Sequence, residues 1–156
     1  MNIYAAGIVP YIKSNNKIQF LLGHEKYNKK WSGFVGKYES SDINIVNTAI
    51  REFNEETARV FEAHLEYVQQ KIISGNCTLI SDNTSSNKLI YIWFIEFPYE
   101  IINLNISNQF LLNLNLMTDN HYKEKTSLKW FNIQDIYQNG ILYKLKKAIL
   151  NNYKKL

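Results

Sequence analysis

The sequence has little that would indicate a secreted or membrane protein. Its single cysteine, Cys77, cannot form an internal disulfide and has no second cysteine with which to build a zinc site. The longest apolar run, residues 88–97, is about half the length needed to span a bilayer. The apolar N-terminal stretch lacks a basic leader and is interrupted by Pro10, which predicts a strand and not a signal peptide. We therefore expect a protein of a reducing, cytoplasmic compartment that has no membrane partner.

The chain also lacks internal repeats and any sign of a second domain. Its 156 residues predict one domain, residues 1–156, and they are enough to bury a core. A hydrophobic content of 46% with 21% charged residues is ordinary for a folded chain. The net charge of +4 favours polyanionic ligands such as nucleotides or RNA, although solvated lysines explain it equally well.

Alternation of apolar runs with polar turns predicts a mixed α and β protein. Residues 88–97 are almost continuously apolar, which is typical of a central strand buried on both faces. Residues 141–156 carry an apolar stripe that predicts a final helix, whereas residues 101–117 have no clear period and stay unassigned. The full set of predicted strands is 4–13, 17–22, 65–74, 76–81, 88–97 and 128–132. Together these elements predict an α+β fold, an α/β/α sandwich with a mixed sheet between helices.

The most informative stretch is residues 36–58, GKYESSDINIVNTAIREFNEETA. A cap at Ser41 or Asp42 would start a helix that runs to about Thr57. Its apolar positions recur at helical spacing and predict one buried stripe, made of Val46, Ala49, Ile50, Phe53 and Thr57. We expect the acidic residues of this helix on the opposite face.

Glu52, Glu55 and Glu56 stand at i, i+3 and i+4, so they share one side of the predicted helix. Like charges at this spacing repel, so a cation is expected between them. Hard divalent cations take carboxylate oxygens, and Mg2+ is held by few carboxylates together with water and substrate phosphate. Arg51 is placed to pair with Glu55. The alternative is an acidic face that is only solvated.

Trp31, which precedes the acidic stretch, offers an aromatic face that could stack on a base. Packing in the core is the equally supported alternative for this residue.

The whole stretch resembles the signature of the Nudix hydrolases: Gly, five residues, Glu, seven residues, then Arg-Glu-apolar-x-Glu-Glu-x-Gly. The preceding WSGFVGK is similar to the lead-in of members that clean nucleotide pools. The residues that fall on positions of the signature are Gly36, Arg51, Glu52, Phe53, Glu55 and Glu56.

The sequence departs from the signature in its loop half. The spacing from Gly36 to Arg51 is one residue too long, so the early Glu is replaced by Asp42 in one register and by Ile43 in the other. Ala58 stands in place of the closing Gly. The metal-binding half is intact, so these departures concern phosphate geometry and rate.

The resemblance implies the Nudix fold and hydrolysis of a pyrophosphate bond in a nucleoside diphosphate linked to another moiety. It implies Mg2+, with Mn2+ as an alternative, held by Glu52, Glu55, Glu56 and the carbonyl of Gly36. Arg51 would orient the acids, and Lys37 could reach a phosphate.

One further acid is expected from a loop before a strand, and Glu124 resembles it, with Asp119 as the substitute. Either Glu52 or Glu124 would take the proton of the attacking water. The favoured substrate is a nucleoside triphosphate such as an oxidised purine nucleotide. Hydrolysis of the mRNA cap and a non-catalytic module that binds nucleotide or RNA are the alternatives.

Overall fold

The computed structural model describes residues 3–138 and 140–156. Within these residues seven strands form one mixed sheet: β1 (Ile3–Ser14), β2 (Lys17–Glu25), β3 (Trp31–Ser32), β4 (Phe34–Lys37), β5 (Thr78–Asn83), β6 (Leu89–Glu96) and β7 (Lys125–Asn132). The α-helices are α1 (Ile45–Glu56), α2 (Leu65–Ile73), α3 (Ile106–Leu116), α4 (Ile133–Tyr137) and α5 (Tyr143–Asn152). Short 3-10 helices are η1 (Glu62–His64), η2 (Tyr99–Asn103), η3 (Asn120–Lys123) and η4 (Tyr153–Lys155).

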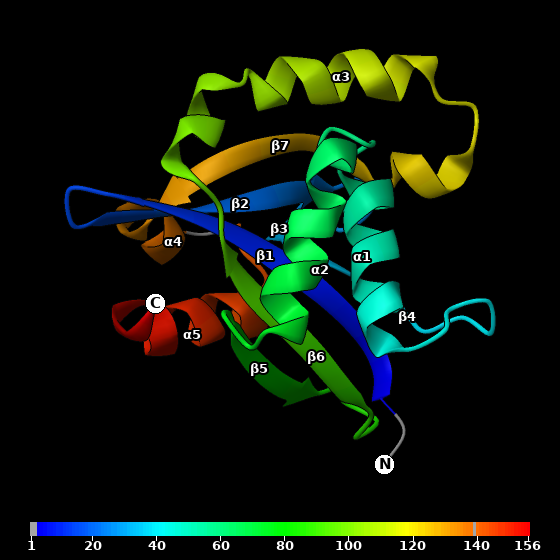
Figure 1. Ribbon diagram of the computed structural model, residues 1–156, viewed down its shortest axis with the longest axis horizontal. Coiled ribbons are helices and arrows are strands. Elements are labelled where there is room, and N and C mark those ends of the chain that lie inside the picture. Colours follow the sequence, from blue (N-terminus) through cyan, green and yellow to red (C-terminus); the bar gives the residue numbers. More distant parts are fainter. Residues whose placement is uncertain (1–2, 139) are drawn as a thin grey trace.

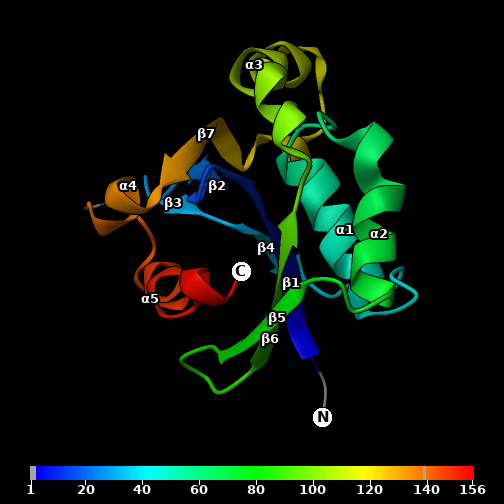
Figure 2. The ribbon, with the colours of Figure 1, turned by 60° about the vertical axis from the view of Figure 1, so that its left-hand side comes forward.

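Helices cover both faces of the sheet, as Figures 1 and 2 show, with α1 and α2 on one side and α5 on the other. The helix α3 packs beside β7. This arrangement is the predicted α/β/α sandwich. No helix within the described part of the chain is both long and apolar enough to cross a membrane.

The long strand β1 organises the sheet, whose order is β3-β2-β1-β6-β5. One edge of β1 pairs in parallel with β6, and the other edge pairs antiparallel with β4 near its start and with β2 near its end. The turn into β2 places Asn15 and Asn16 at φ 49° and 64°, a conformation that Asn tolerates better than most residues. β2 and β4 thus follow one another along the same edge of β1, and β4 packs against α1.

Two apolar clusters fill the sandwich, one on each face of the sheet. The α1 side contains stacked phenylalanines, with the rings of Phe53 and Phe61 5.2 Å apart. The α5 side is built around Phe20, Phe94 and Ile149. Full burial of each such side chain contributes about 1.5–3 kcal/mol. Alternate residues of β6 enter the two clusters, which confirms the prediction of a central strand buried on both faces.

One predicted strand is wrong, because residues 65–74 form the helix α2. Tyr, Val and Ile in this stretch favour a strand by propensity, but Leu65, Val68 and Ile72 recur at helical spacing and pack on the α1 side. The hairpin predicted at Gly75 is therefore also wrong, and Gly75 follows the helix end at φ 74°.

Two other regions differ from the prediction in extent. The strand β2 continues to Glu25, into what the sequence predicted as a loop, and residues 101–117, left unassigned, form part of η2 and α3. The other predicted strands, and the final helix, are present with shifted ends.

Candidate active site

The helix α1 begins two or three residues later than the sequence predicts. Its cap is Asn44, whose side chain accepts a hydrogen bond from the backbone N–H of Asn47 at 3.0 Å. The prediction of a cap at Ser41 or Asp42 is therefore wrong. The reason is that the Asp42 carboxylate is occupied elsewhere, by Arg51 and by the Thr48 hydroxyl.

The buried face of α1 also differs from the predicted stripe. Glu52 and Glu56 face inward with exposed fractions of 8% and 2%, while Val46 and Ile50 are only partly buried. The expectation that all the acids lie opposite the core is therefore wrong. The Glu52 side chain has room to face inward because Gly36 on β4 has no side chain. A Cβ built at Gly36 would stand 2.0 Å from the Glu52 carboxyl carbon.

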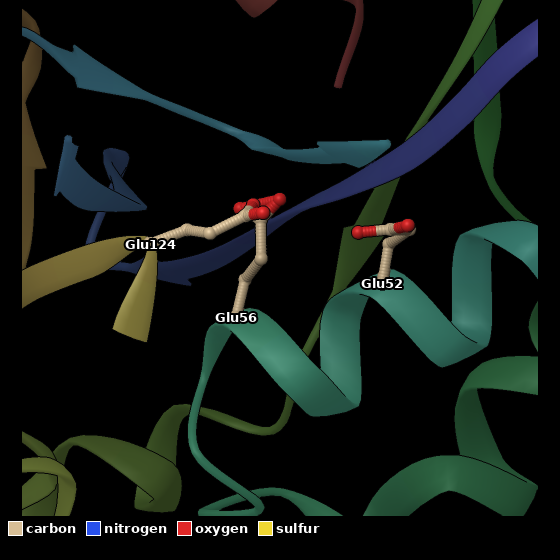
Figure 3. A group of neighbouring side chains, drawn as sticks. All are labelled: Glu52, Glu56 and Glu124. Atoms are coloured by element: carbon tan, nitrogen blue, oxygen red, sulfur yellow. The ribbon is translucent and has the colours of Figure 1, made fainter. Parts of the chain in front are cut away.

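Three carboxylates converge at this inward face. One oxygen from each of Glu52, Glu56 and Glu124 lies within 4.8 Å of the others, and we call these three residues the acid cluster. Figure 3 shows Glu124 reaching the two helix residues from the segment that leads into β7. Because Glu124 is exposed, solvent reaches the acid cluster from that side. Asp119, the substitute acid, instead accepts from the His121 backbone N–H at 2.9 Å.

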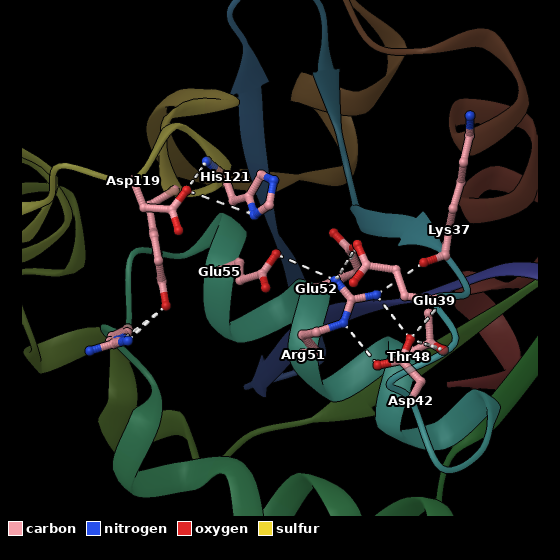
Figure 4. A network of polar contacts seen from close by, with 11 residues as sticks. Lys37, Glu39, Asp42, Thr48, Arg51, Glu52, Glu55, Asp119 and His121 are labelled. Atoms are coloured by element: carbon pink, nitrogen blue, oxygen red, sulfur yellow. Dashed lines mark hydrogen bonds and ion pairs between the residues drawn. The ribbon is translucent and has the colours of Figure 1, made fainter.

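Arg51, in the middle of α1, flanks the acid cluster beside Glu52, as Figure 4 shows. Its Nε donates to Asp42 Oδ1 at 2.9 Å and its Nη2 to Asp42 Oδ2 at 3.0 Å, a two-point pair. Its Nη1 donates to Glu52 Oε1 at 2.7 Å, and the same atom lies 3.5 Å from Glu55 Oε2. Glu55 therefore stands beside Arg51 and is not one of the three acids that converge.

The contacts of Asp42 distinguish it from its neighbour Ile43. Asp42 is buried and bound to Arg51, whereas Ile43 is 87% exposed. These contacts favour the register in which Asp42, and not Ile43, replaces the early Glu of the signature. The hydrogen bonds from Arg51 lower the pKa of Asp42 to about 2.

Lys125 flanks the acid cluster at the other end and was missed by the sequence analysis. It is 3% exposed, and its Nζ lies 3.3 Å from Glu56 Oε2. Its Nζ also donates to the Ser32 hydroxyl and to the carbonyl of Gly33. A lysine after a glutamate in a polar segment carries no local signal for burial, so only the folded structure reveals it.

Burial raises the pKa values of the helix acids. The pKa of Glu56 rises to about 8 because burial outweighs the opposing effect of Lys125. Burial likewise raises the pKa of Glu52, against the effect of Arg51, and that of Glu55. Each carboxylate is thus less easily ionised than in water unless a further cation is present.

A divalent cation fits this donor set. Glu56 Oε2 is buried and makes no hydrogen bond with the described residues, and the Lys125 ammonium forms an ion pair with it at 3.3 Å. Such an orphaned buried oxygen is rare in folded proteins. Together with oxygens from Glu52 and Glu124, it supplies the hard ligands that Mg2+ and Mn2+ prefer.

The two predicted substrate-binding side chains lie outside the acid cluster. The Lys37 side chain extends away from the carboxylates in Figure 4, and its Nζ lies 5.5 Å from the centre of the Tyr4 ring. The Trp31 ring packs between His24 and Phe131, with centroids at 4.9 and 5.0 Å, in the α5-side cluster. A role for either residue in substrate binding stays a prediction.

The clearest hollows of the surface lie elsewhere. A cavity of about 890 Å3 is lined by residues of the β1–β2 turn and of the C-terminal segment, and one of about 270 Å3 by residues 102–107 with Leu21 and Trp130. Neither of these two cavities is lined by a residue of the acid cluster.

The comparisons with known proteins give a result by structure only. No family sequence model and no curated protein matches the chain. An Ap4A hydrolase of C. elegans, solved as a binary complex, is similar at 18% identity over 99% of this chain and 100% of that chain, with a TM-score of 0.58.

Two further solved structures give the same picture. The NUDIX domain of Shewanella oneidensis NrtR complexed with ADP ribose is similar at 9% identity over 99% of this chain and 88% of that chain, with a TM-score of 0.60. A NUDIX-family hydrolase of Clostridium perfringens is similar at 16% identity over 100% and 99%, with a TM-score of 0.56. The chain therefore has the Nudix fold, as predicted.

Proposed function

We propose that this protein is a divalent-metal-dependent hydrolase that cleaves a pyrophosphate bond in a nucleoside diphosphate linked to another moiety. One observation carries the proposal. The carboxylates of Glu52, Glu56 and Glu124 converge within 4.8 Å, and one of their oxygens is buried without a hydrogen-bond partner. The Nudix fold of the chain supports the same reaction class.

The acid cluster would hold the metal, Mg2+ or Mn2+, with Glu55 and the carbonyl of Gly36 as the further ligands that the sequence resemblance implies. When bound, such an ion neutralises charge on the pyrophosphate and lowers the pKa of a water. The other steps of the reaction depend on the protein's own side chains.

Proton transfer falls to Glu52 or Glu124. Glu52 is held by Arg51 at 2.7 Å, and Arg51 is in turn fixed by Asp42, so this carboxylate has a defined direction. Glu124 is exposed, which gives water access to it. Either carboxylate can accept the proton of an attacking water, as general-base catalysis requires.

The substrate class remains broad within this proposal. The lead-in around Trp31 favours nucleoside triphosphates, including oxidised purine forms, by resemblance. One structural neighbour is an Ap4A hydrolase and another was solved with ADP ribose, and both compounds contain phosphoanhydride bonds. Capped RNA is a further candidate substrate, because the net charge of +4 favours a polyanionic ligand.

The test is an assay with Mg2+ or Mn2+ over these substrates, with products identified by mass. We expect metal-dependent turnover of at least one compound by the wild type and a loss of at least about a hundredfold in Glu56→Gln, because one carboxylate of the metal site is neutralised. Glu62→Gln, at an exposed glutamate of η1, is the matched control and should retain full activity.

Two results would contradict the proposal. One is unchanged activity in Glu56→Gln. The other is the lack of turnover of every compound by the folded protein, and binding of a compound without turnover would then identify a non-catalytic module.

A further inference from the structure

Lys125 is surrounded by oxygen atoms from three other elements. Besides Glu56 Oε2 at 3.3 Å, its Nζ lies 3.1 Å from the Gly33 carbonyl and 3.6 Å from Glu25 Oε1, and it donates to the Ser32 hydroxyl. The Ser32 hydroxyl donates in turn to Glu25 Oε1 at 2.6 Å. A buried ammonium is costly unless it is paired and hydrogen-bonded, and this one meets both conditions.

The surrounding structure makes room for the whole Lys125 side chain. A Cβ at Gly23 on β2 would stand 2.9 Å from the Lys125 Cδ and 3.0 Å from the Phe34 ring, so glycine leaves the path that the methylene chain follows. The ammonium lies 5.8 Å from the centre of the Phe34 ring. Lys129 on the same strand is exposed, which is the usual state of a lysine. The residues around Lys125 therefore accommodate its whole side chain in the interior.

Its charge acts on the residue at the centre of the acid cluster. Lys125 faces Oε2 of Glu56. Glu52, from α1, and Glu124, from the segment that leads into β7, approach the same carboxyl group. Charges a few ångströms apart interact strongly away from bulk water. A fixed ammonium here therefore both orients Glu56 and repels any divalent ion that the acid cluster attracts.

We propose that Lys125 is a positioning residue that serves as a built-in cation of the acid cluster. It lies against Glu56 Oε2 as an ion pair without a hydrogen bond, so the carboxylates of the cluster stay available for metal, and its charge weakens the affinity of the site for divalent ions. This inference rests on the proposed function, since it assumes that the acid cluster binds metal. It predicts that the site binds divalent ions weakly, because Lys125 already supplies part of the positive charge beside the carboxylates.

The experiment measures Mn2+ binding to the 156-residue chain at pH 8, by calorimetry and by the electron paramagnetic resonance signal of free Mn2+. Lys125→Met keeps the methylene chain and removes the charge. We expect it to bind Mn2+ with at least about tenfold higher affinity than the wild type, because a repulsive charge is gone. Lys125→Arg, which keeps the charge, and Lys129→Met, the exposed control on β7, should stay within about threefold of the wild type.

A second readout guards against a variant that folds poorly. Without metal, Lys125→Met should melt at a lower temperature than the wild type, and saturating Mn2+ should raise its melting temperature by more than it raises that of the wild type. If Lys125→Met does not fold even with Mn2+, Lys125→Gln replaces it in both measurements, because a glutamine can still donate to Ser32 and Gly33.

The outcomes separate the two proposals. Unchanged or weaker Mn2+ affinity in the folded neutral variant, or a tenfold gain also in Lys125→Arg, overturns the role of Lys125 while leaving the metal site in place. Absence of Mn2+ binding in the wild type overturns both the metal site and this inference.

Discussion

The two ends of the acid cluster are held by different cations in different ways. At one end, the partners of Arg51 all come from residues 37–55, and its side chain is 22% exposed. At the other end, the partners of Lys125 come from β2, from the β3–β4 junction and from α1, and its side chain is 4% exposed. The first end is a local network and the second is a product of the tertiary fold.

This difference shows how a changed loop leaves the site intact. Asp42 reaches Arg51 although the segment from Gly36 is one residue longer than the family signature, because a loop can absorb a residue while both side chains are flexible. Lys125 has no such freedom, because it sits between packed strands and a helix. We therefore expect the Arg51 end to depend on pairing of charges, and the Lys125 end to depend on both packing and charge.

The largest expected effect breaks the Arg51 end. Arg51→Met leaves the buried Asp42 carboxylate without its partner, so we expect a loss of about 3 kcal/mol in the free energy of unfolding. Glu52 also loses its hydrogen bond, so turnover should fall at least about a hundredfold. Urea unfolding and steady-state kinetics measure the two effects, with the exposed Arg59→Met as control. Wild-type turnover in Arg51→Met would show that the local network is dispensable.

The next effect displaces one acid without touching either cation. In Gly36→Ala the new Cβ would stand 2.0 Å from the Glu52 carboxyl carbon, so this side chain must move. A shift of about 1 Å in a catalytic group can cost about a hundredfold in rate, and we expect a loss of this size. Gly75→Ala is the control, because it strains a backbone at φ 74° in open space without reaching the site. Equal turnover in Gly36→Ala and Gly75→Ala would contradict the expectation that a side chain at position 36 displaces Glu52.

A smaller effect concerns stability and pH at the Arg51 end. The pKa of Asp42 is about 2 in the folded protein, below its ordinary value of 3.8. The ionised form therefore stabilises the fold above about pH 4, and this contribution is lost as the pH falls towards 2. Asp42→Asn should cost about 2 kcal/mol at pH 7 and much less at pH 2.5, measured by urea unfolding. If the cost of Asp42→Asn does not change with pH, it arises from packing and not from the ion pair. The control Asp82→Asn, at a side chain that is 43% exposed, should cost little at either pH.

The smallest effect restores the family's closing glycine. Ala58 adopts φ 50°, which costs an alanine about 1 kcal/mol, but its methyl group is fully buried, and losing it costs a similar amount. We expect Ala58→Gly to change the melting temperature by less than about 3 °C and to leave turnover unchanged. A tenfold rise in turnover would mean that this departure from the signature limits the proposed activity.

What the sequence predicted well was local. Helical spacing places Glu52 and Glu56 on one side of α1, and the structure brings the Glu124 carboxylate beside them, while its part in the reaction stays a prediction. The rotation of α1 could not be predicted, because it depends on the space that Gly36 leaves on a strand. Nor could the cap, since Ser41, Asp42 and Asn44 are all suitable residue types and only the pairing of Asp42 with Arg51 leaves Asn44 as the cap.

The remaining errors arise from contacts between distant segments. Residues 65–74 have the composition of a strand, and their helix is stabilised by packing on the α1 side. Lys125 contacts Ser32, 93 residues earlier in the chain, and nothing in the residues around either position predicts that contact.

The most direct test of the account is an anomalous difference map from crystals of the protein soaked in Mn2+. The account predicts a peak between the carboxylates of Glu52, Glu56 and Glu124, with the Lys125 ammonium still beside Glu56. Lack of a peak at these three residues, in crystals where they are ordered and the soak has reached the site, would contradict it.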